Sequence, residues 1–356
     1  MNSMIKYRLL SLSDKEAWEA FLLRFPQDQQ EIYYSPYYYE LYESIGDGKA
    51  QCFVYEDNND LAIYPFLINS VNKLGYILNR EFSDIQGAYG YNGILTSNDS
   101  KFFLDSFFEC FDNFCVDNNI IAEFLRVNPL TNNPLIHRND FLLIHDQENI
   151  FVNLLNSDIF ETAFEYSTRK NIRKAIKSGL TYKYVLGDDI RDLDLKSFRD
   201  IYNHTMERNN VNQYYFFDEK FFNGIAKRLN QKALFAFVMF ENQIISCEIV
   251  LLGGKTAYSF LGGTLSDYYQ YRPNDFLKYN TILVLKEIGY HNYLLGGGPE
   301  GVLRYKRSFS KDGEVPFFIG KRIHNQEIYN EVVRQWEKRN PDKVELYKNF
   351  VLKYRY

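Results

Sequence analysis

The alternation of hydrophobic and polar positions predicts helices and strands in turn along both halves of the chain. In the first half, a helix is expected to start at Ser35-Pro36, because proline fits a first helical turn. Strands over Gln51 to Tyr55 and Leu61 to Ile68 follow, joined by a polar turn. Aromatic residues spaced by three and four then predict a long amphipathic helix after residue 100.

The second half repeats this style. A helix over Ser167 to Gly179, closed by its glycine, precedes a meander of antiparallel strands. Those strands are expected at Ala233 to Phe240, Ile244 to Leu252 and Thr256 to Leu261. A helix starting near Pro273 then crosses over to a short strand at Tyr293 to Leu295. Each half therefore has the same α+β order of elements.

We place a domain boundary near residue 155, where one run of strands ends and a new helical run begins. This gives a first domain over residues 1–155 and a second over 156–325, with closing helices at 326–338 and 341–355. No heptad run is long enough to predict a coiled-coil arm.

A glycine-rich stretch in the second domain is the first candidate for chemistry. Three glycines directly follow the strand at Tyr293 to Leu295, namely Gly296, Gly297 and Gly298. They permit backbone conformations and close approach that a Cβ would forbid. Three cations follow on a predicted short helix: Arg304, Lys306 and Arg307. The pattern fits a site for an anion or carbonyl, and it also fits a plain loop beside a solvated basic helix.

A second basic helix opens the second half of the chain. Arg169, Arg173 and Lys177 are four residues apart and share one helical face, with Lys170 and Lys174 beside it. A solvated charged face explains this pattern as well as an anion site does. The lack of an intervening acid in a net acidic chain favours the anion site.

Two further segments supply candidate site residues. The segment from Asp84 to Leu95 is rich in glycine and tyrosine, so Tyr89 and Tyr91 belong either to a packed aromatic turn or to the wall of a substrate cleft. Glu248 lies inside the most apolar predicted strand. A buried carboxylate is costly unless it is paired, which makes Glu248 a candidate general base, while the simpler interpretation is an acid that points outward from a half-exposed strand.

Composition narrows the class of protein. The chain has 356 residues, 46% of them hydrophobic, and a formal net charge of −5, so any contact with a polyanion is expected from a local patch. Four cysteines without CxxC spacing and five scattered histidines predict neither a disulfide framework nor a metal site. We see no signal-peptide pattern and no apolar run that spans a bilayer, and we expect a cytoplasmic protein.

Several short motifs, taken together, resemble the FemABX peptidyltransferase family over most of the chain. They are LGGT (Leu261 to Thr264), the Pro273-Asn274 helix start that follows Arg272, the strand into the three glycines, and RYKRSF (Arg304 to Phe309). AYGYNG (Ala88 to Gly93) resembles the loop of that family's first domain, and RKNIRKAIKSG its basic helix. The resemblance implies two tandem domains of the N-acyltransferase (GNAT) fold.

The family transfers an amino acid from aminoacyl-tRNA to an amine of a cell-wall precursor, and related proteins act in surface-polysaccharide assembly. Its aromatic-lysine pair falls on Tyr305 and Lys306, where Phe is usual at the first position. The resemblance therefore implies catalytic roles for these two residues and no resident cofactor. It also implies substrate contacts for the cations and glycines named above. The acceptor is then expected to be a precursor linked to a nucleotide, or to a lipid at the inner face of a membrane.

The chemistry can also be argued from the residues. Amide formation from an ester or thioester passes through an oxyanion, which Lys306 can stabilise as an ammonium. No Ser-His-Asp order marks a nucleophile, so the acceptor amine is expected to attack directly. Its proton goes to Glu248, to Asp84 or to the substrate.

The donor is the open question. Acyl-CoA enzymes of this fold normally carry a glycine-rich pyrophosphate loop, and the corresponding segment SDYYQYRPNDF has no glycine. This favours aminoacyl-tRNA over acyl-CoA. Two alternatives remain open: an acetyl-CoA-dependent N-acetyltransferase of amino sugars, and a non-catalytic protein that binds glycan precursors.

Overall fold

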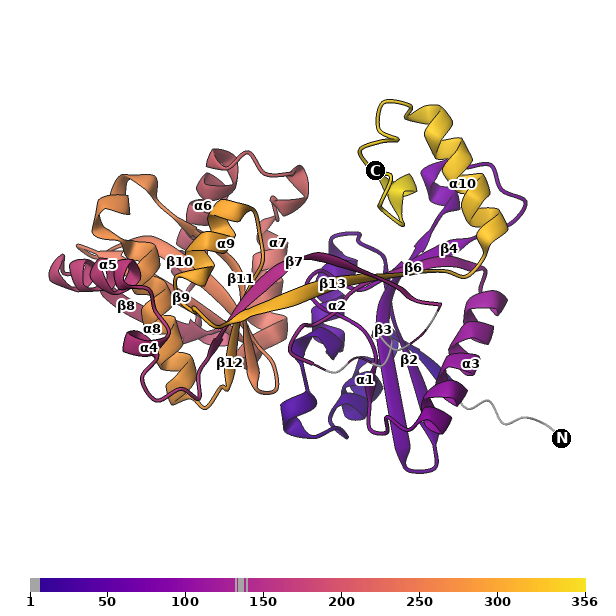
Figure 1. The fold of residues 1–356 in the computed structure, drawn as a ribbon, viewed down its shortest axis with the longest axis horizontal. Coiled ribbons are helices and arrows are strands. Elements are labelled where there is room, and N and C mark those ends of the chain that lie inside the picture. Colours follow the sequence, from indigo (N-terminus) through magenta and orange to yellow (C-terminus); the bar gives the residue numbers. More distant parts are fainter. Residues whose placement is uncertain (1–6, 132, 134–137, 139) are drawn as a thin grey trace. The chain divides into compact units, whose positions relative to one another are not determined.

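The computed structural model describes residues 7–131, 133, 138 and 140–356. These residues form two compact units, each built from more than one stretch of sequence (Figure 1). Unit 1 comprises the described parts of residues 1–25, 33–146 and 317–356, and unit 2 comprises residues 26–32 and 147–316. Residues after 316 belong with the first half of the sequence because their strand pairs with a strand of unit 1.

The strands of unit 1 are hydrogen-bonded in the order β1-β2-β3-β4-β6-β13. Their bounds are Tyr7–Ser11 (β1), Lys49–Asp57 (β2), Asp60–Ser70 (β3), Ser83–Gln86 (β4), Ile120–Arg126 (β6) and Glu314–Ile323 (β13), and β5 (Leu95–Thr96) pairs with β3. The helices of this unit are α1 (Lys15–Leu22), α2 (Pro36–Ser44), α3 (Lys101–Asp117) and α10 (Gln326–Arg339).

The aromatic stripe of α3 forms the core of unit 1, as its spacing predicts. Phe107, Phe111 and Phe114 are buried and meet Phe53 of β2 with ring centroids 5.7, 5.2 and 5.4 Å apart. These edge-on and tilted contacts are the geometry that aromatic rings favour. The sheet of unit 1 is thus fixed to α3 through rings from both elements.

The expectation of a second closing helix at 341–355 is wrong. Residues 341–352 run through turns, and the only helical segment of that stretch is a short 3-10 turn at Lys353–Arg355. Tyr354 and Arg355 instead bind a buried carboxylate of β4, which holds the chain on an irregular path. Val351 and Leu352 are buried in the same cluster as Trp336 of α10.

The strands of unit 2 follow the order β7-β12-β11-β10-β9-β8. Their bounds are Leu142–Asn153 (β7), Asn292–Gly296 (β12), Thr256–Thr264 (β11), Gln243–Leu252 (β10), Ala233–Phe240 (β9) and Thr181–Leu186 (β8). The helices are α4 (Ile159–Thr162), α5 (Tyr166–Lys177), α6 (Asp192–Arg208), α7 (Glu219–Gly224), α8 (Pro273–Glu287) and α9 (Glu300–Arg307). The predicted meander is confirmed as β9, β10 and β11.

Neighbouring residues of β10 show which helices cover each face of this sheet. Cys247 points to the backbone of Phe198 in α6, whereas Glu248 points to Lys278 in α8. Successive side chains of a strand face opposite sides. Helix α6 therefore covers one face, while α8, with α5 packed against it, covers the other.

Strands β11 and β12 separate at one end of unit 2. They are parallel and pair with each other only over Thr256–Tyr258 and Asn292–Leu294; beyond that point β11 continues to Thr264 paired with β10, and the end of β12 pairs with β7. Helix α8 connects them, so its first turn and the glycines after β12 lie at the end where the two strands no longer pair with each other. Backbone groups that face the partner strand no longer bond to it at this end and can meet a ligand.

Candidate active site

A buried ion pair lies at the centre of unit 2. Glu248 of β10 and Lys278 of α8 are only 4% and 8% exposed, and the Nζ–Oε1 distance is 2.5 Å. The same Oε1 also accepts hydrogen bonds from the Ser259 hydroxyl at 2.5 Å and the Tyr293 hydroxyl at 2.8 Å. One carboxylate oxygen is therefore bonded to donors from α8, β11 and β12.

The second carboxylate oxygen of Glu248 differs from Oε1, which has three donors. Oε2 is buried and has no hydrogen-bond partner among the residues that the structure describes. A buried acceptor without a partner costs about 1–3 kcal/mol, and more when it is charged. Native proteins keep such an atom mainly where a ligand, a water or a reacting group completes the bond.

The β11 residue opposite Glu248 is a glycine. Gly262 pairs with Glu248 in the ladder, and a Cβ at Gly262 would come within 2.8 Å of the Cys247 carbonyl oxygen. The position of β11 directly opposite the acid therefore carries no side chain, whereas Ser259 of the same strand reaches Oε1.

Lys306 of α9 contacts the predicted glycine turn. Its Nζ donates to the Gly297 carbonyl oxygen at 2.5 Å. Gly296 and Gly298 have φ values of +75° and +138°, which other residues rarely adopt. The turn is held by Gln147 of β7, whose side-chain oxygen accepts from the Gly298 amide at 3.0 Å. The local sequence thus brings the lysine to the end of β12.

The charge of Lys306 is finely balanced. Burial lowers its pKa, the positive charge of Lys278 lowers it further, and the negative charge of Glu248 opposes both, so that the resulting pKa is about 7. The three side chains therefore act as one electrostatic group. An ammonium that loses its proton near neutral pH can stabilise negative charge or exchange a proton during a reaction.

Tyr305 packs beside this group. Its ring lies edge-on to Phe309 with centroids 5.2 Å apart. Burial and the carboxylates of Asp275 and Glu248 hold the pKa of its hydroxyl well above the usual range. Tyr305 is therefore a neutral phenol whose ring is part of the packing of α9.

The structure separates the predicted cations of unit 2 into two groups. Arg169 and Arg173 bind Glu161 at 3.4 and 3.1 Å, and Arg307 binds Glu300 and Glu314. Lys177 and Arg304, in contrast, are exposed and have no side-chain partner among the described residues. Of these five cations, Lys177 and Arg304 alone can meet a ligand without losing an ion pair.

The polar side chains in the first turn of α8 are bonded to other residues of the protein rather than left open for a phosphate. Arg272 is exposed in a left-handed conformation at φ +62°, and the Asn274 side chain accepts from the Ser246 and Thr264 hydroxyls. Asp275 is buried in the first helical turn, bonded to Asn171, and burial raises its pKa. An acid at this position already occupies the positive end of the helix dipole.

The predicted site residues of unit 1 have packing contacts. Asp84 is fully buried, and both of its oxygens bind Arg355 and Tyr354, so it has no free acceptor for a substrate. The Tyr89 ring lies under the guanidinium of Arg126, and Tyr91 meets Phe317 edge-on. We leave Asp84 out of the candidate site, and the substrate contacts of Tyr89 and Tyr91 stay predictions.

Sequence reasoning missed Lys278, Ser259 and Tyr293. Lys278 was the one with a usable signal, because it falls on the buried stripe of α8 at helical spacing from Thr281, Ile282 and Leu285. A lysine on an apolar stripe requires a buried acid as its partner, and Glu248 was the one acid already noted in an apolar strand.

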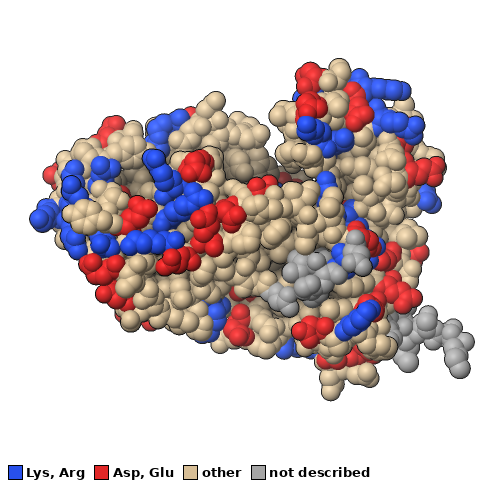
Figure 2. All heavy atoms as spheres, viewed as in Figure 1, with Lys and Arg blue, Asp and Glu red and all other residues tan. Residues whose placement is uncertain are grey.

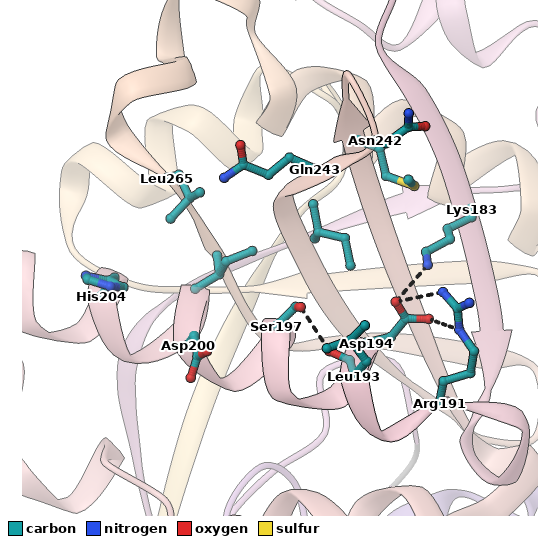
Figure 3. A pocket seen from close by; sticks show the side chains of 13 residues that line it. Lys183, Arg191, Leu193, Asp194, Ser197, Asp200, His204, Asn242, Gln243 and Leu265 are labelled. Carbon is teal, nitrogen blue, oxygen red and sulfur yellow. Dashed lines mark hydrogen bonds and ion pairs between the residues drawn. The ribbon is translucent and has the colours of Figure 1, made fainter.

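An open pocket of about 450 Å³ lies on the α6 side of the sheet (Figure 3). Lys183 and Arg191 both bind the Asp194 carboxylate at its edge, and His204 and Gln243 line it further along. Lys183 and Arg191 are thus paired with Asp194, and Asp200 of the lining is paired with Lys196. Among the described residues no cluster of His, Cys, Asp and Glu has the arrangement of a metal site, and no helix has the length and apolarity to cross a membrane.

Residues 166–307 match the family model of the acetyltransferase (GNAT) domain. This stretch covers α5 to α9 and includes the Glu248, Lys278 and Lys306 group, so the candidate site lies within the part of the chain that matches this model. No curated protein sequence matches the chain.

Solved structures show the wider fold. The chain is similar to FemX at 14% identity and a TM-score of 0.67, over 91% of this chain and 99% of that one. It is also similar to a C-terminal domain from Agrobacterium fabrum described as that of a lysylphosphatidylglycerol synthetase (14% identity, 88% and 93% covered, TM-score 0.54). A conserved protein of unknown function from Bacteroides thetaiotaomicron has 10% identity, 89% and 99% coverage and a TM-score of 0.53. The predicted α+β fold with tandem GNAT-like domains is confirmed.

Proposed function

We propose that the protein forms an amide bond by moving an aminoacyl or acyl group from an activated ester onto an amine of an envelope glycan precursor. The observation that carries this proposal is the unpartnered Oε2 of Glu248, buried in one electrostatic group with Lys306. A proton acceptor and a cation at the end where β11 and β12 no longer pair with each other are the two functions that amide formation needs.

The reaction balances with these two side chains. The acceptor nitrogen attacks the ester carbonyl carbon, and the carbonyl oxygen becomes an oxyanion that the Lys306 ammonium stabilises. Glu248 Oε2 takes the proton that the attacking nitrogen loses. The carbon–oxygen bond of the ester then breaks, and the proton passes from Glu248 to the departing alkoxide. No covalent enzyme intermediate is required.

We infer the donor from the first turn of α8. The segment before it forms a 3-10 helix over Ser266–Tyr271 without glycine, and Asp275 holds the place where a pyrophosphate would accept backbone hydrogen bonds. These features favour aminoacyl-tRNA over acyl-CoA. An acetyl-CoA-dependent transfer to amino sugars is the second candidate, favoured by the match of residues 166–307 to an acetyltransferase model.

A panel of donors tests the proposal. Purified protein is incubated with charged tRNAs or acyl-CoAs and an amino-bearing precursor, and the product is detected by mass spectrometry. We expect amide formation with a charged tRNA and none with acyl-CoA. Calorimetric CoA binding together with acetyl transfer would favour the second candidate. Ligand-dependent thermal stabilisation without turnover of any donor would instead assign a non-catalytic binding protein.

Two variants test the cation. Lys306→Met should lower kcat by about 100-fold, because loss of one oxyanion donor costs about 3 kcal/mol in the barrier. In the wild type, kcat/KM should carry a limb that falls as pH rises through about 7, where Lys306 loses its proton. Lys306→Arg keeps a cation at every pH and should abolish that limb. Wild-type turnover by a folded Lys306→Met protein would remove the residue from the mechanism.

A further inference from the structure

The outward side of α5 carries a straight row of one ring and three cations. Tyr166, Lys170, Arg173 and Lys177 follow one another at intervals of four, three and four residues, which places them on a single helical stripe. Thr168, Ile172 and Ala175 are buried on the opposite side of the helix. With a rise of 1.5 Å per residue the row extends over about 16 Å.

Most of the positive charge on this helix is not neutralised by the protein. Glu161 binds Arg169 and Arg173. Lys170, Lys174 and Lys177 are exposed, and none of them has a side-chain hydrogen bond or ion pair to any residue in the described part of the chain. In a chain whose net charge is −5, unpaired lysines gathered on one helix point to an anionic partner.

Two large apolar side chains of the same helix are exposed as well: Tyr166 begins the row, and Ile176 lies about a quarter-turn around the helix from it. Tyr166 is 70% exposed and Ile176 is 54% exposed. A partner that offers only phosphates gains nothing from the side chain of Ile176. A lipid surface takes up both kinds of group, because apolar side chains enter the acyl boundary while lysines stay at the headgroups.

The basic surface continues beyond α5. The backbone of α5's start is bonded to the end of α9, through Glu165 N to Ser308 O at 2.9 Å, and Lys311 N binds Ala163 O at 3.1 Å. Arg304 and Lys311 are exposed on this neighbouring segment. Figure 2 shows Lys and Arg side chains gathered over the part of the view where Figure 1 places α5 and α9.

We propose that this α5 surface, made of Tyr166, Lys170, Lys174, Ile176 and Lys177, binds the surface of an anionic phospholipid bilayer. The helix lies along the headgroups, with the lysines on lipid phosphates and with Tyr166 and Ile176 in the interface. Because Lys306 belongs to α9, whose end is bonded to the start of α5, binding holds the candidate active site close to the bilayer.

Co-sedimentation with vesicles tests the proposal on the full-length protein. We expect binding to phosphatidylcholine vesicles that contain phosphatidylglycerol, weakened by added salt, and none to phosphatidylcholine alone. A Lys170→Gln, Lys174→Gln, Lys177→Gln variant should bind about 100-fold more weakly, since each lysine near an anionic surface contributes about fivefold. Ile176→Ser should weaken binding while its salt dependence stays that of the wild type.

A matched control removes the same charge elsewhere. Lys220, Lys227 and Lys338 are exposed lysines of other helices, and their triple replacement by Gln should leave vesicle binding unchanged. Equal loss in both triple variants, or binding that does not depend on phosphatidylglycerol, would overturn the proposal. The proposal would also be overturned if the wild-type protein did not bind vesicles but bound RNA, and if only the α5 triple variant lost that RNA binding. Vesicle binding needs no turnover, so its failure would leave the proposed acyl transfer untouched.

Discussion

Removing the lysine from the buried ion pair should destabilise unit 2 strongly. In Lys278→Met the carboxylate of Glu248 stays buried and keeps only the hydroxyls of Ser259 and Tyr293 as donors. Methionine replaces the stem of the lysine with little change in volume, so the loss of the charge dominates. The perturbation therefore isolates the cost of leaving one buried charge without its partner.

The magnitude follows from the burial of both partners. Breaking a buried pair by removing one member costs about 3–5 kcal/mol, because the remaining charge is not compensated. Both residues here are less than a tenth exposed, so solvent gives little relief. With a urea slope of about 2 kcal/mol/M, the midpoint of unit 2 should fall by about 2 M.

Urea unfolding can follow the two units separately. The only tryptophans, Trp18 and Trp336, both lie in unit 1, so tryptophan fluorescence follows that unit and serves as an internal control. Hydrogen exchange of peptides from β10 and α8, read by mass spectrometry, follows unit 2. We expect early exchange in those peptides of Lys278→Met and an unchanged fluorescence midpoint.

A double variant decides whether the charge is the cause. Lys278→Met with Glu248→Gln removes the uncompensated charge and keeps an oxygen that accepts from Ser259 and Tyr293. It should recover most of the lost stability, so the two substitutions should be far from additive. The reasoning is refuted if Lys278→Met loses less than about 1 kcal/mol, or if the double variant is less stable than the single one.

Two further predictions concern groups around the sheet of unit 2. Burial raises the pKa of Glu31 to about 7, so its contribution to stability is full below its ordinary value and is lost as pH rises through about 7. Glu31→Gln keeps an acceptor for the Tyr258 hydroxyl. In urea titrations the variant should be more stable than the wild type by about 3 kcal/mol at pH 8 and no more stable at pH 4. An equal stability difference at the two pH values would contradict this. Gly297→Ala places a Cβ 2.6 Å from the Gln147 side chain, so turnover should fall, whereas Gly301→Ala on α9 has no atom within 4 Å and should keep turnover.

The order of elements could be predicted because each carries a strong local signal. The aromatic repeat of α3 and the apolar runs of β9 and β10 leave few alternatives to a buried stripe or a central strand. Strand β8 was not predicted, since its residues Thr181–Leu186 are exposed or half-buried and alternate weakly. The stretch after α10 was predicted as a helix because local pattern does not reveal that Arg355 binds the distant Asp84.

The candidate site shows the same division between local and long-range information. Lys306 and the glycine turn lie within one stretch of sequence, so their proximity could be predicted. The partner of Glu248 could not, because Lys278 is brought to β10 only by the crossover of α8. Nor could the sequence tell that Arg173 and Arg307 are engaged by nearby acids while Lys177 and Arg304 are free.

The return of β13 to β6 has a consequence for the nascent chain. Unit 1 needs residues 317–356, which leave the ribosome only after all of residues 147–316 have been made. At about 5–20 residues per second, this delay lasts roughly 10–30 s. During that interval the outer edge of β6 has no neighbouring strand, and an open edge invites pairing with other chains. Early shielding by a chaperone would therefore matter more for the first half of the polypeptide than for the second.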